Sequence, residues 1–337
     1  MKQLKRGISI IICCYNSSWI IEETLQYIFS QRLEDATDWE IILVDNASTD
    51  GTGELVKKVF TKNRQNFHKC KLVREEKPGL IYARNKGINE SQYEYLLFCD
   101  DDNLLSENYI QSIFEIMDSD PRIGACGGKG IPFIKGLEPA WFPKYQTGYA
   151  VGSQKRKGEI LQLYGAGICI RKTVLEELKN IGFESILTGR KGNILLAGED
   201  AELTMSAKLI GYKLYASDKL LFQHVLSEKR MTIDYLLKMY YGFGYSDPIL
   251  FYYRKAVIEM EEGKTFKSHF KNHFTFLLKN TLQFVFKGLF SEGINREVTL
   301  SLLRGFFDGS RMLVPEIKKC QIMIQKMVLY KMEINKQ

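Results

Sequence analysis

The chain has 337 residues, 45% of them hydrophobic, and a formal net charge of +7. This length and apolar content are enough for one large domain or for a domain with an appendage. No stretch contains 18 uncharged apolar residues, which excludes a membrane-spanning helix. The positive charge is concentrated in residues 204–337, which contain 21 Lys+Arg and 12 Asp+Glu, so we expect two functional regions.

The seven cysteines are odd in number, and no two of them have CxxC spacing. Cys13, Cys14, Cys99 and Cys169 lie in apolar runs, which predicts buried free thiols in a reducing compartment and argues against a zinc site. The apolar run near the N-terminus is too short to span a bilayer, and no small-residue cleavage site follows it. We therefore expect a first strand here and a cytoplasmic protein.

Apolar runs and helical patterns alternate along the first hundred residues. The expected strands are residues 8–14, 39–48, 71–76 and 93–102. Helical patterns lie between them at 19–31, from Thr52 onward and at 79–91, and Asp50 or Thr52 could cap the second helix. This alternation predicts an α/β fold with a mainly parallel sheet flanked by helices and right-handed crossovers.

Polar residues follow three of these strands directly. They are Tyr15 and Asn16, then Asp45 and Asn46, and finally Asp100 to Asp102. Ligands bind beyond the carboxyl ends of the strands in such sheets, so these side chains are expected at one edge. Taken singly, Asn16 and Asn46 could make turns, and Asp45 could cap a helix.

Three adjacent carboxylates at the exit of a buried strand repel one another. One of them could cap a helix, but a cap does not explain three. A divalent cation relieves the repulsion and prefers oxygen ligands, and Mg²⁺ or Mn²⁺ held by one or two carboxylates usually also binds a substrate phosphate. The cluster therefore predicts a seat for Mn²⁺ or Mg²⁺ and a diphosphate.

Five segments in order resemble the family 2 glycosyltransferases with the GT-A fold, of bacterial surface-polysaccharide type. They are SIIICCYNSSWIIEETLQYIFSQ, EIILVDNASTDGT, EEKPGLIYARNKGI, LLFCDDDN and LLAGEDAELTMSAKLIGYKLY followed by QHV, and they cover roughly residues 7–226. The resemblance implies a hexosyl- or related transferase that takes a nucleotide-diphosphate sugar and inverts the anomeric carbon. It also implies a saccharide or lipid-linked saccharide as acceptor and no nucleic-acid partner.

On the donor side, the resemblance assigns Asp45 to the nucleobase and Arg84 to a position near the nucleotide. A helix-surface ion pair is the alternative for Arg84. Tyr15 and Asn16 are placed with the donor. Asp102 is assigned direct metal contact, and Asp100 or Asp101 lies nearer the ribose or a metal-bound water, with the register open by one residue because the middle position is also Asp.

Glu199 and Asp200 open a predicted helix, where the helix dipole alone would favour carboxylates. The resemblance assigns Asp200 the general base, which must take the proton of the acceptor hydroxyl, and Glu199 an orienting or acceptor-contacting role. His224 follows 24 residues after Asp200 and is either a metal ligand, as the resemblance implies, or a packed core histidine.

Two loops are candidate substrate contacts. Trp141 lies between prolines in EPAWFPKY and could stack on a sugar acceptor or plug a hydrophobic gap. Residues 189–193, GRKGN, are basic and flanked by glycine, which suggests a loop that closes over phosphates.

We divide the chain into a nucleotide-sugar-binding and catalytic domain, residues 1–226, and a helical C-terminal region, residues 227–337. The second region contains aromatic-rich helices with interspersed lysines, including Phe270, Phe274 and Phe284. Such helices can pack on the catalytic domain, pair with a second subunit in a homo-oligomer, or lie on the inner face of the cell membrane as a peripheral contact.

Three rival functions are weaker. A dinucleotide oxidoreductase requires G-x-G-x-x-G after the first strand, where this chain has CCYNSS. A sugar nucleotidyltransferase typically opens with a glycine-rich basic loop, which is also missing. A non-catalytic nucleotide-sugar or glycan-binding relative stays open as an alternative, although all the expected carboxylates are present.

Overall fold

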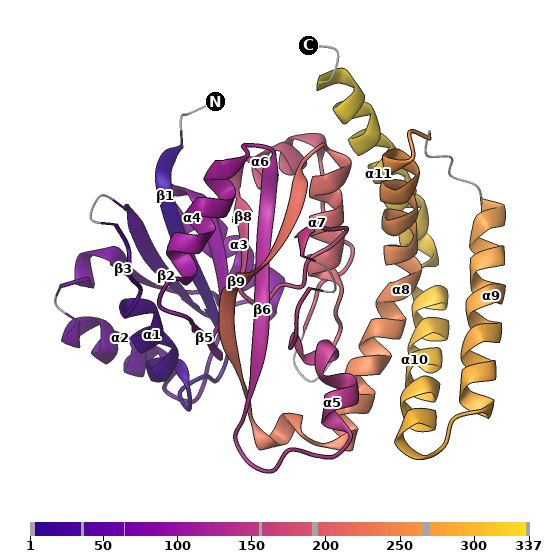
Figure 1. The fold of residues 1–337 in the computed structure, drawn as a ribbon, viewed down its shortest axis with the longest axis horizontal. Helices are drawn as coiled ribbons and strands as arrows, with labels where there is room; N and C mark the ends of the chain where they lie inside the picture. The colour runs from indigo at the N-terminus through magenta and orange to yellow at the C-terminus, as the bar shows by residue number, and fades with distance from the viewer. Residues whose placement is uncertain are drawn as a thin grey trace. The chain divides into compact units, whose positions relative to one another are not determined.

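The computed structural model describes residues 4–34, 37–63, 65–154, 157–190, 195–264 and 270–334. The chain divides into two compact units. The first contains the nine-stranded sheet, and the second contains the helices of the C-terminal region (Figure 1). The sheet unit comprises Met1–Lys135, Tyr149–Glu177 and Tyr212–Leu226, and the helical unit comprises Gly136–Gly148, Leu178–Gly211 and Ser227–Gln337. The sheet unit thus ends at residue 226, but two segments before that position belong to the helical unit.

The N-terminal half of the sheet is parallel, with the strand order β3-β2-β1-β4. β1 and β2 are apolar, largely β-branched runs buried on both faces, as expected for strands covered by helices on two sides. This half confirms the predicted alternation of strands and helices. The bounds are β1 Lys5–Cys14, α1 Ile21–Phe29, β2 Trp39–Asp45, α2 Thr52–Lys62, η1 Phe67–Lys69, β3 Cys70–Arg74, α3 Leu80–Glu90 and β4 Tyr93–Asp100.

After β4 the sheet becomes mixed. β8 pairs antiparallel with β4 and β6, β9 runs parallel to β6, and β5 and β7 pair antiparallel with β9. The sheet is therefore mixed: its first half is wholly parallel, and its second half combines the parallel pair β6–β9 with antiparallel pairs. The bounds are β5 Asn103–Leu105, α4 Tyr109–Ser119, β6 Ile123–Ile134, η2 Gln146–Tyr149, β7 Gly158–Glu159, β8 Ile168–Arg171, α6 Lys172–Ile181 and β9 Lys213–Leu226.

The main core of the sheet unit lies between the strands and the helices α1, α2 and α4. Ile10, Ile12 and Leu97 are fully buried there, and burial of each such side chain stabilises the fold by about 1.5–3 kcal/mol. The Tyr95 ring packs edge-on against Phe114 at a centroid distance of 5.4 Å. This packing gives the ends of β1, β2 and β4 a rigid base.

The helical unit depends on close approach between α8 and α10. A Cβ on Gly305 would lie 2.0 Å from the Tyr241 carbonyl oxygen, and one on Gly244 would lie 2.1 Å from that of Leu302, so the two backbones touch where side chains are missing. In the described residues no helix is both long enough and apolar enough to cross a bilayer. The bounds are α5 Phe142–Tyr145, α7 Glu199–Leu209, η3 Glu228–Arg230, α8 Ile233–Glu261, α9 Phe270–Leu289, α10 Gly293–Met312 and α11 Val314–Ile334.

Candidate active site

The carboxyl ends of β1, β2 and β4 meet at one edge of the sheet. The register pairs Cys14 with Asp45 across β1 and β2, and Cys13 with Asp100 across β1 and β4. Asp45 and Asp100 therefore flank the end of the same strand, which confirms the predicted common edge. The loops that leave these strands supply the remaining polar groups.

Asp45 is held by a guanidinium group. Its carboxylate is 5% exposed, and Oδ2 accepts a hydrogen bond of 2.6 Å from Nη1 of Arg74, while Oδ1 accepts one of 3.0 Å from the backbone N–H of Ser48. Arg74 is the last residue of β3 and lies opposite Asp45 in the register. Arg74 was not predicted from the sequence, although it ends the third parallel strand, where ligand-binding residues are expected.

Tyr15 and Asn16 differ in their surroundings. The Tyr15 side chain is 57% exposed at the edge of the sheet. Asn16 has φ of 55°, in the left-handed region that Asn tolerates better than most residues. Its Oδ1 accepts a hydrogen bond of 2.9 Å from the Thr49 N–H, and its own N–H donates to Ser48 Oγ at 3.1 Å. Asn16 therefore ties together the loops after β1 and β2.

The Asn46 side chain stabilises a loop, in agreement with the alternative interpretation that this residue makes a turn. Its Nδ2 donates to the carbonyl oxygen of Lys77 at 2.8 Å, and its Oδ1 accepts from the Gly79 N–H at 2.8 Å. These bonds fix the loop that leads from β3 into α3. Asn46 is 5% exposed, so its side chain stabilises the loop and is not open to a ligand from solvent.

The three adjacent aspartates contact different elements. The Asp101 carboxylate accepts a hydrogen bond from the hydroxyl of Ser17, in the loop after β1. Asp102 is 2% exposed, and its backbone carbonyl accepts a hydrogen bond of 2.9 Å from Val225 in β9. Asp100 ends β4 and is half-buried. The contact of Ser17 with Asp101 is one that the sequence did not reveal.

Asp102 lies beside His224. The imidazole Nε2 is 3.3 Å from Asp102 Oδ1, and His224 is 5% exposed. The other ring nitrogen, Nδ1, lies 2.7 Å from the carbonyl oxygen of Tyr149. A carbonyl can only accept, so Nδ1 carries the proton of that hydrogen bond. Nε2 then either bears a second proton, forming an ion pair with Asp102, or presents a lone pair toward the carboxylate.

This pair fits a divalent cation that is also held by substrate. A lone pair on Nε2 and a carboxylate oxygen at this distance are both donors of electron density, and a cation between them would satisfy both. The hydrogen bond from Nδ1–H to a carbonyl is the outer contact that orients metal-binding histidines. No group of three or more His, Cys, Asp or Glu side chains arranged for a metal occurs in the described part of the chain. Two protein ligands are enough where substrate phosphates complete the shell.

Arg84 lies on α3 near the ends of β1 and β4. Its guanidinium carbon is 5.7 Å from the centroid of the Phe98 ring, and the side chain is half-buried. Burial raises the pKa of the Cys13 thiol to about 12, and the Arg84 charge opposes that rise, so the guanidinium field reaches the end of β1. Arg84 therefore adds positive charge close to the strand ends.

Glu199 and Asp200 are the first two residues of α7, in the helical unit, as predicted. Both are half-buried. The φ of Gly189 is 68°, which favours glycine, and a Cβ there would lie 2.8 Å from Glu199 Oε1 and displace that carboxylate. The helix start places two carboxylates where the dipole favours the charged form.

Two contacts fix the start of α7. The hydroxyl of Ser246 in α8 donates to the carbonyl oxygen of Ala197. The fully buried carboxylate of Glu202 accepts hydrogen bonds from the Ser185 hydroxyl at 2.6 Å and from the Leu187 N–H at 2.9 Å. Burial raises the pKa of Glu202, and these hydrogen bonds oppose the rise. The sequence did not single out Glu202, because a carboxylate in the first turn of a helix normally faces solvent.

The structure gives few contacts for the described residues of the two candidate substrate loops, the one with Trp141 and the one at 189–193. Trp141 is half-buried before α5, and its ring centroid lies 6.4 Å from that of Phe142. In the loop at 189–193, Gly189 and Arg190 are described and Arg190 is exposed, whereas residues 191–193 lie outside the described residues. The proposed closing over phosphates stays a prediction.

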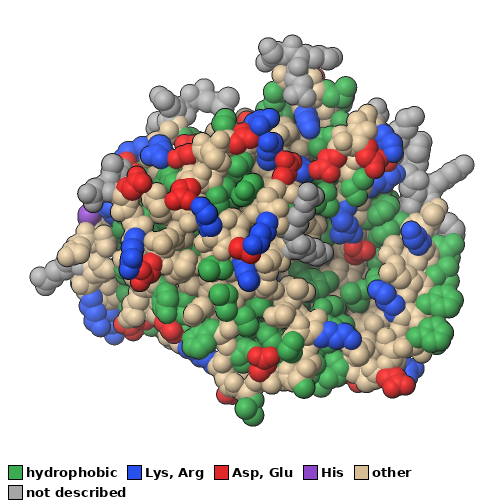
Figure 2. Space-filling view, in the orientation of Figure 1, with side chains coloured by type: hydrophobic (Ala, Val, Ile, Leu, Met, Phe, Trp, Pro, Cys, Tyr) green, Lys and Arg blue, Asp and Glu red, His purple; other side chains and the backbone are tan. Residues whose placement is uncertain are grey.

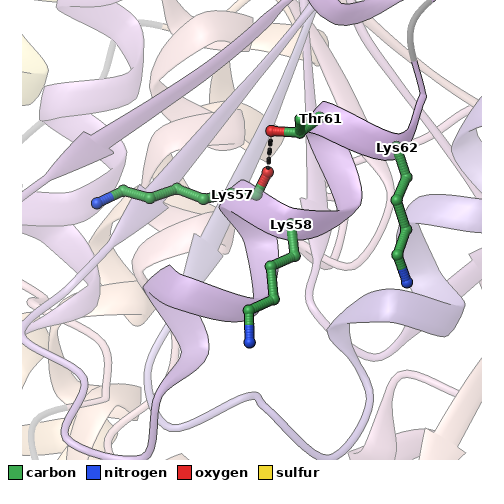
Figure 3. A pocket seen from close by; sticks show the side chains of 4 residues that line it. All are labelled: Lys57, Lys58, Thr61 and Lys62. Carbon is green, nitrogen blue, oxygen red and sulfur yellow. Dashed lines mark hydrogen bonds between the residues drawn. The ribbon is translucent and has the colours of Figure 1, made fainter.

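A hollow of about 580 Å³ lies on α2 and is lined by Lys57, Lys58, Thr61 and Lys62. Figure 3 shows the three lysine chains spreading away from one another along the helix. The Thr61 hydroxyl donates to the Lys57 carbonyl oxygen at 2.8 Å, within the same helix. None of the candidate residues lines this hollow, and we assign it no role.

A known protein family matches the part of the chain that contains these strand ends. The model of the family described as "Glycosyl transferase family 2" matches residues 9–179, just over half of the chain. The chain belongs to glycosyl transferase family 2. The matched segment includes the parallel half of the sheet and all three aspartates of the cluster.

Curated relatives of this family 2 chain are polysaccharide synthases. The poly-beta-1,6-N-acetyl-D-glucosamine synthase of Staphylococcus aureus (strain COL) is 32% identical over 122 residues, which are 36% of this chain and 28% of that protein. The synthase of the same name from Staphylococcus epidermidis is 29% identical over 184 residues, 52% of this chain and 42% of that protein. The chain thus matches less than half the length of these relatives.

Solved structures share the GT-A-type fold. TarS residues 1–349 of S. aureus, in complex with UDP, has a TM-score of 0.50 and 17% identity, covering 98% of this chain and 91% of that one. The mannosyltransferase PcManGT of Pyrobaculum calidifontis, in complex with GDP-Man and Mn2+, has a TM-score of 0.55 and 15% identity, covering 92% and 87%. At these identities the likeness concerns the fold alone.

Proposed function

We propose that this family 2 chain is an inverting, divalent-cation-dependent glycosyltransferase that moves a sugar from a nucleotide-diphosphate donor to a hydroxyl of a saccharide or lipid-linked saccharide. The observation that carries the proposal is the buried Asp102–His224 pair, which lies in the unit whose sheet edge also holds Asp45 and Asp100. Polar groups for a nucleotide and for a diphosphate-bound cation are thus supplied by one sheet.

In this proposal Asp102 and His224 hold Mn²⁺ or Mg²⁺. The cation, when bound, neutralises the charge that develops on the diphosphate as it leaves. Asp45, held by Arg74, receives the nucleobase, and the open edge near Tyr15 admits the nucleoside. Arg84 adds positive charge toward the phosphates.

Asp200 acts as the general base. Its carboxylate takes the proton of the acceptor hydroxyl while the hydroxyl oxygen forms a bond to the anomeric carbon. The bond to the diphosphate breaks on the opposite face, and the nucleoside diphosphate departs with that electron pair, which inverts the configuration. Glu202 and Ser246 keep the start of α7, and with it Asp200, in place.

The relatives suggest where to begin with donors. Their printed names concern N-acetylglucosamine polymers, and the fold neighbours were solved with UDP or with GDP-Man. We therefore propose UDP-N-acetylglucosamine as the first donor to test, GDP-mannose as the second, and short saccharides and lipid-linked saccharides as acceptors in surface-polysaccharide assembly.

The test is an incubation of the purified chain with each donor, Mn²⁺ and an acceptor panel, followed by proton NMR of the product. The proposal predicts transfer from one donor with inverted anomeric configuration, and loss of transfer with EDTA. Transfer with retention would contradict the role of Asp200. Neither hydrolysis nor transfer from any donor, with the protein folded, would favour the non-catalytic binding relative.

A further inference from the structure

Helix α9 carries an apolar stripe on its outer side. Each of its exposed apolar side chains has another one three or four residues away, which places them on one face of the helix. They are Leu278, Leu282, Val285, Phe286 and Leu289, and Phe290 follows directly after the helix. Figure 2 shows hydrophobic side chains gathered along the edge where Figure 1 draws α9.

The opposite side of α9 is already occupied. Phe276 stacks on Phe251 at a centroid distance of 3.8 Å, and Phe284 packs edge-on against Phe306 of α10 at 5.7 Å. The helix therefore packs within the helical unit through this side, and the outer stripe faces away from that packing. The exposed fraction is 52% at Leu278 and 40% at Val285, and it is largest at the end of the stripe, 69% at Leu289 and 83% at Phe290.

The segment that carries the stripe has charged residues of one sign up to Glu292, which follows Phe290 by two positions. Residues 263–291 contain five lysines and no Asp or Glu. Two of these lysines, Lys279 and Lys287, are exposed on α9 itself. Elsewhere in the sequence no stretch without Asp or Glu is as long. A continuous segment of this length without a carboxylate is therefore a local feature of α9 and its approach.

Two partners can cover such an apolar stripe, a second copy of α9 or a lipid surface, and the charge of α9 favours the lipid surface. A second copy of α9 would bring its own lysines beside these and no carboxylate to pair with them, which disfavours self-association through this face. An anionic lipid surface supplies the opposite charge over a wide area, and its interfacial zone accepts Leu and Phe side chains.

We propose that the outer face of α9, from Leu278 to Phe290, is a docking surface for an anionic membrane. The helix lies in the plane of the interface, Phe286, Leu289 and Phe290 enter the boundary of the acyl chains, and the lysines contact the headgroups. This inference does not depend on the transferase reaction and is tested without it.

The experiment is co-sedimentation of the full chain with vesicles of phosphatidylcholine, with or without 30% phosphatidylglycerol as the anionic lipid. We expect at least tenfold stronger partitioning onto the anionic vesicles at low salt, with a marked fall at 0.5 M NaCl. The double variant Phe286→Asp/Leu289→Asp should lose this binding. Lys279→Gln/Lys287→Gln should weaken it roughly thirtyfold, because each lysine near the surface contributes about a factor of five.

The matched control is Leu137→Asp, which adds a carboxylate at a leucine that is 92% exposed outside α9 and should leave vesicle binding unchanged. Circular dichroism melting checks that each variant is folded. The proposal is overturned if the unaltered chain does not bind anionic vesicles, or if the folded Phe286→Asp/Leu289→Asp variant binds them equally well. It is also overturned if sedimentation velocity shows a dimer that this variant dissociates, since the face would then join two copies.

Discussion

The imidazole Nε2 of His224 lies 3.3 Å from the Asp102 carboxylate, and its Nδ1 lies 2.7 Å from the carbonyl oxygen of Tyr149. The two residues are 122 positions apart, and the antiparallel pairing of β5 with β9, which sets Asn103 opposite His224, brings them together. A histidine in an apolar strand is usually a packed core residue. The metal-binding role that we propose for His224 rests on its contact with a buried carboxylate.

Removal of the imidazole should weaken cation binding. We expect His224→Ala to lower the affinity for Mn²⁺ in the presence of UDP by roughly 10- to 100-fold, the range seen when contacts of a metal site are lost. Titration followed by the paramagnetic resonance of free Mn²⁺ measures this directly. His68→Ala, at an exposed histidine in the sheet unit, is the matched control and should change nothing. Equal Mn²⁺ affinity in the two variants would leave His224 as a core histidine.

The charge of Asp200 should matter for turnover and not for donor binding. Asp200→Asn keeps the shape but cannot accept the acceptor proton, so we expect kcat to fall by about 10²- to 10⁴-fold. Donor affinity, measured by calorimetry, should stay within about twofold. Asp234→Asn changes an exposed carboxylate at the start of α8, which pairs with Lys238, and should retain activity. An Asp200→Asn enzyme with normal kcat would show that another group is the base.

Stability should depend on the pH through Glu202. Burial raises its pKa in the folded chain above the ordinary value of 4.5, so between these two pKa values the folded chain binds more protons than the unfolded chain. The free energy of unfolding attributable to this group therefore falls as the pH rises through that window, by at most about 1.4 kcal/mol per pH unit.

Glu202→Gln removes this titration. Urea unfolding of both proteins from pH 4.5 to pH 8 should show the stability of the unaltered chain relative to the variant declining with rising pH, then levelling off above the folded pKa. A difference that is constant over the whole range would mean that Glu202 is charged in the fold throughout, with its pKa not raised.

The close approach of α8 and α10 should not tolerate a methyl group. Gly305→Ala would place Cβ 2.0 Å from the Tyr241 carbonyl oxygen, so we expect a loss of about 1–3 kcal/mol in the free energy of unfolding. Gly288→Ala is the matched control, because Gly288 is also helical and the nearest atom to its Cβ position is 3.8 Å away. That variant should be neutral or more stable by up to about 1 kcal/mol, since alanine favours helices. Equal stability of the two variants would show that the helices can separate at no cost.

Local patterns in the sequence were sufficient for the first half of the sheet. Residues 8–14 and 39–45 are mostly apolar runs rich in β-branched residues, and the polar residues at their ends lie at the common edge because parallel strands share a direction. The mixed half escaped prediction because β8 is only four residues long and its direction is set by pairing with β4 and β6, which are distant in sequence.

The same difference between local and distant contacts applies to the candidate site. Asp45, Asp100 and Asp200 stand where a strand ends or a helix begins, and such positions can be read from periodicity. Arg74 and Ser17 could not be assigned in this way, because their significance lies in which carboxylate they contact. Distant pairs of this kind depend on the register of the sheet and on loop geometry, which periodicity does not encode.

We propose that Asp102 helps to hold a cation which binds a nucleotide diphosphate. The most direct measurement is calorimetric titration of UDP, GDP, dTDP and CDP into the unaltered chain and into Asp102→Asn, each with Mn²⁺ and with EDTA. We expect one nucleotide to bind the unaltered chain tightly with Mn²⁺ and weakly with EDTA, and this difference to disappear in Asp102→Asn. Binding that is equally tight with EDTA, or that Asp102→Asn leaves unchanged, would contradict the assignment of the cation to this residue.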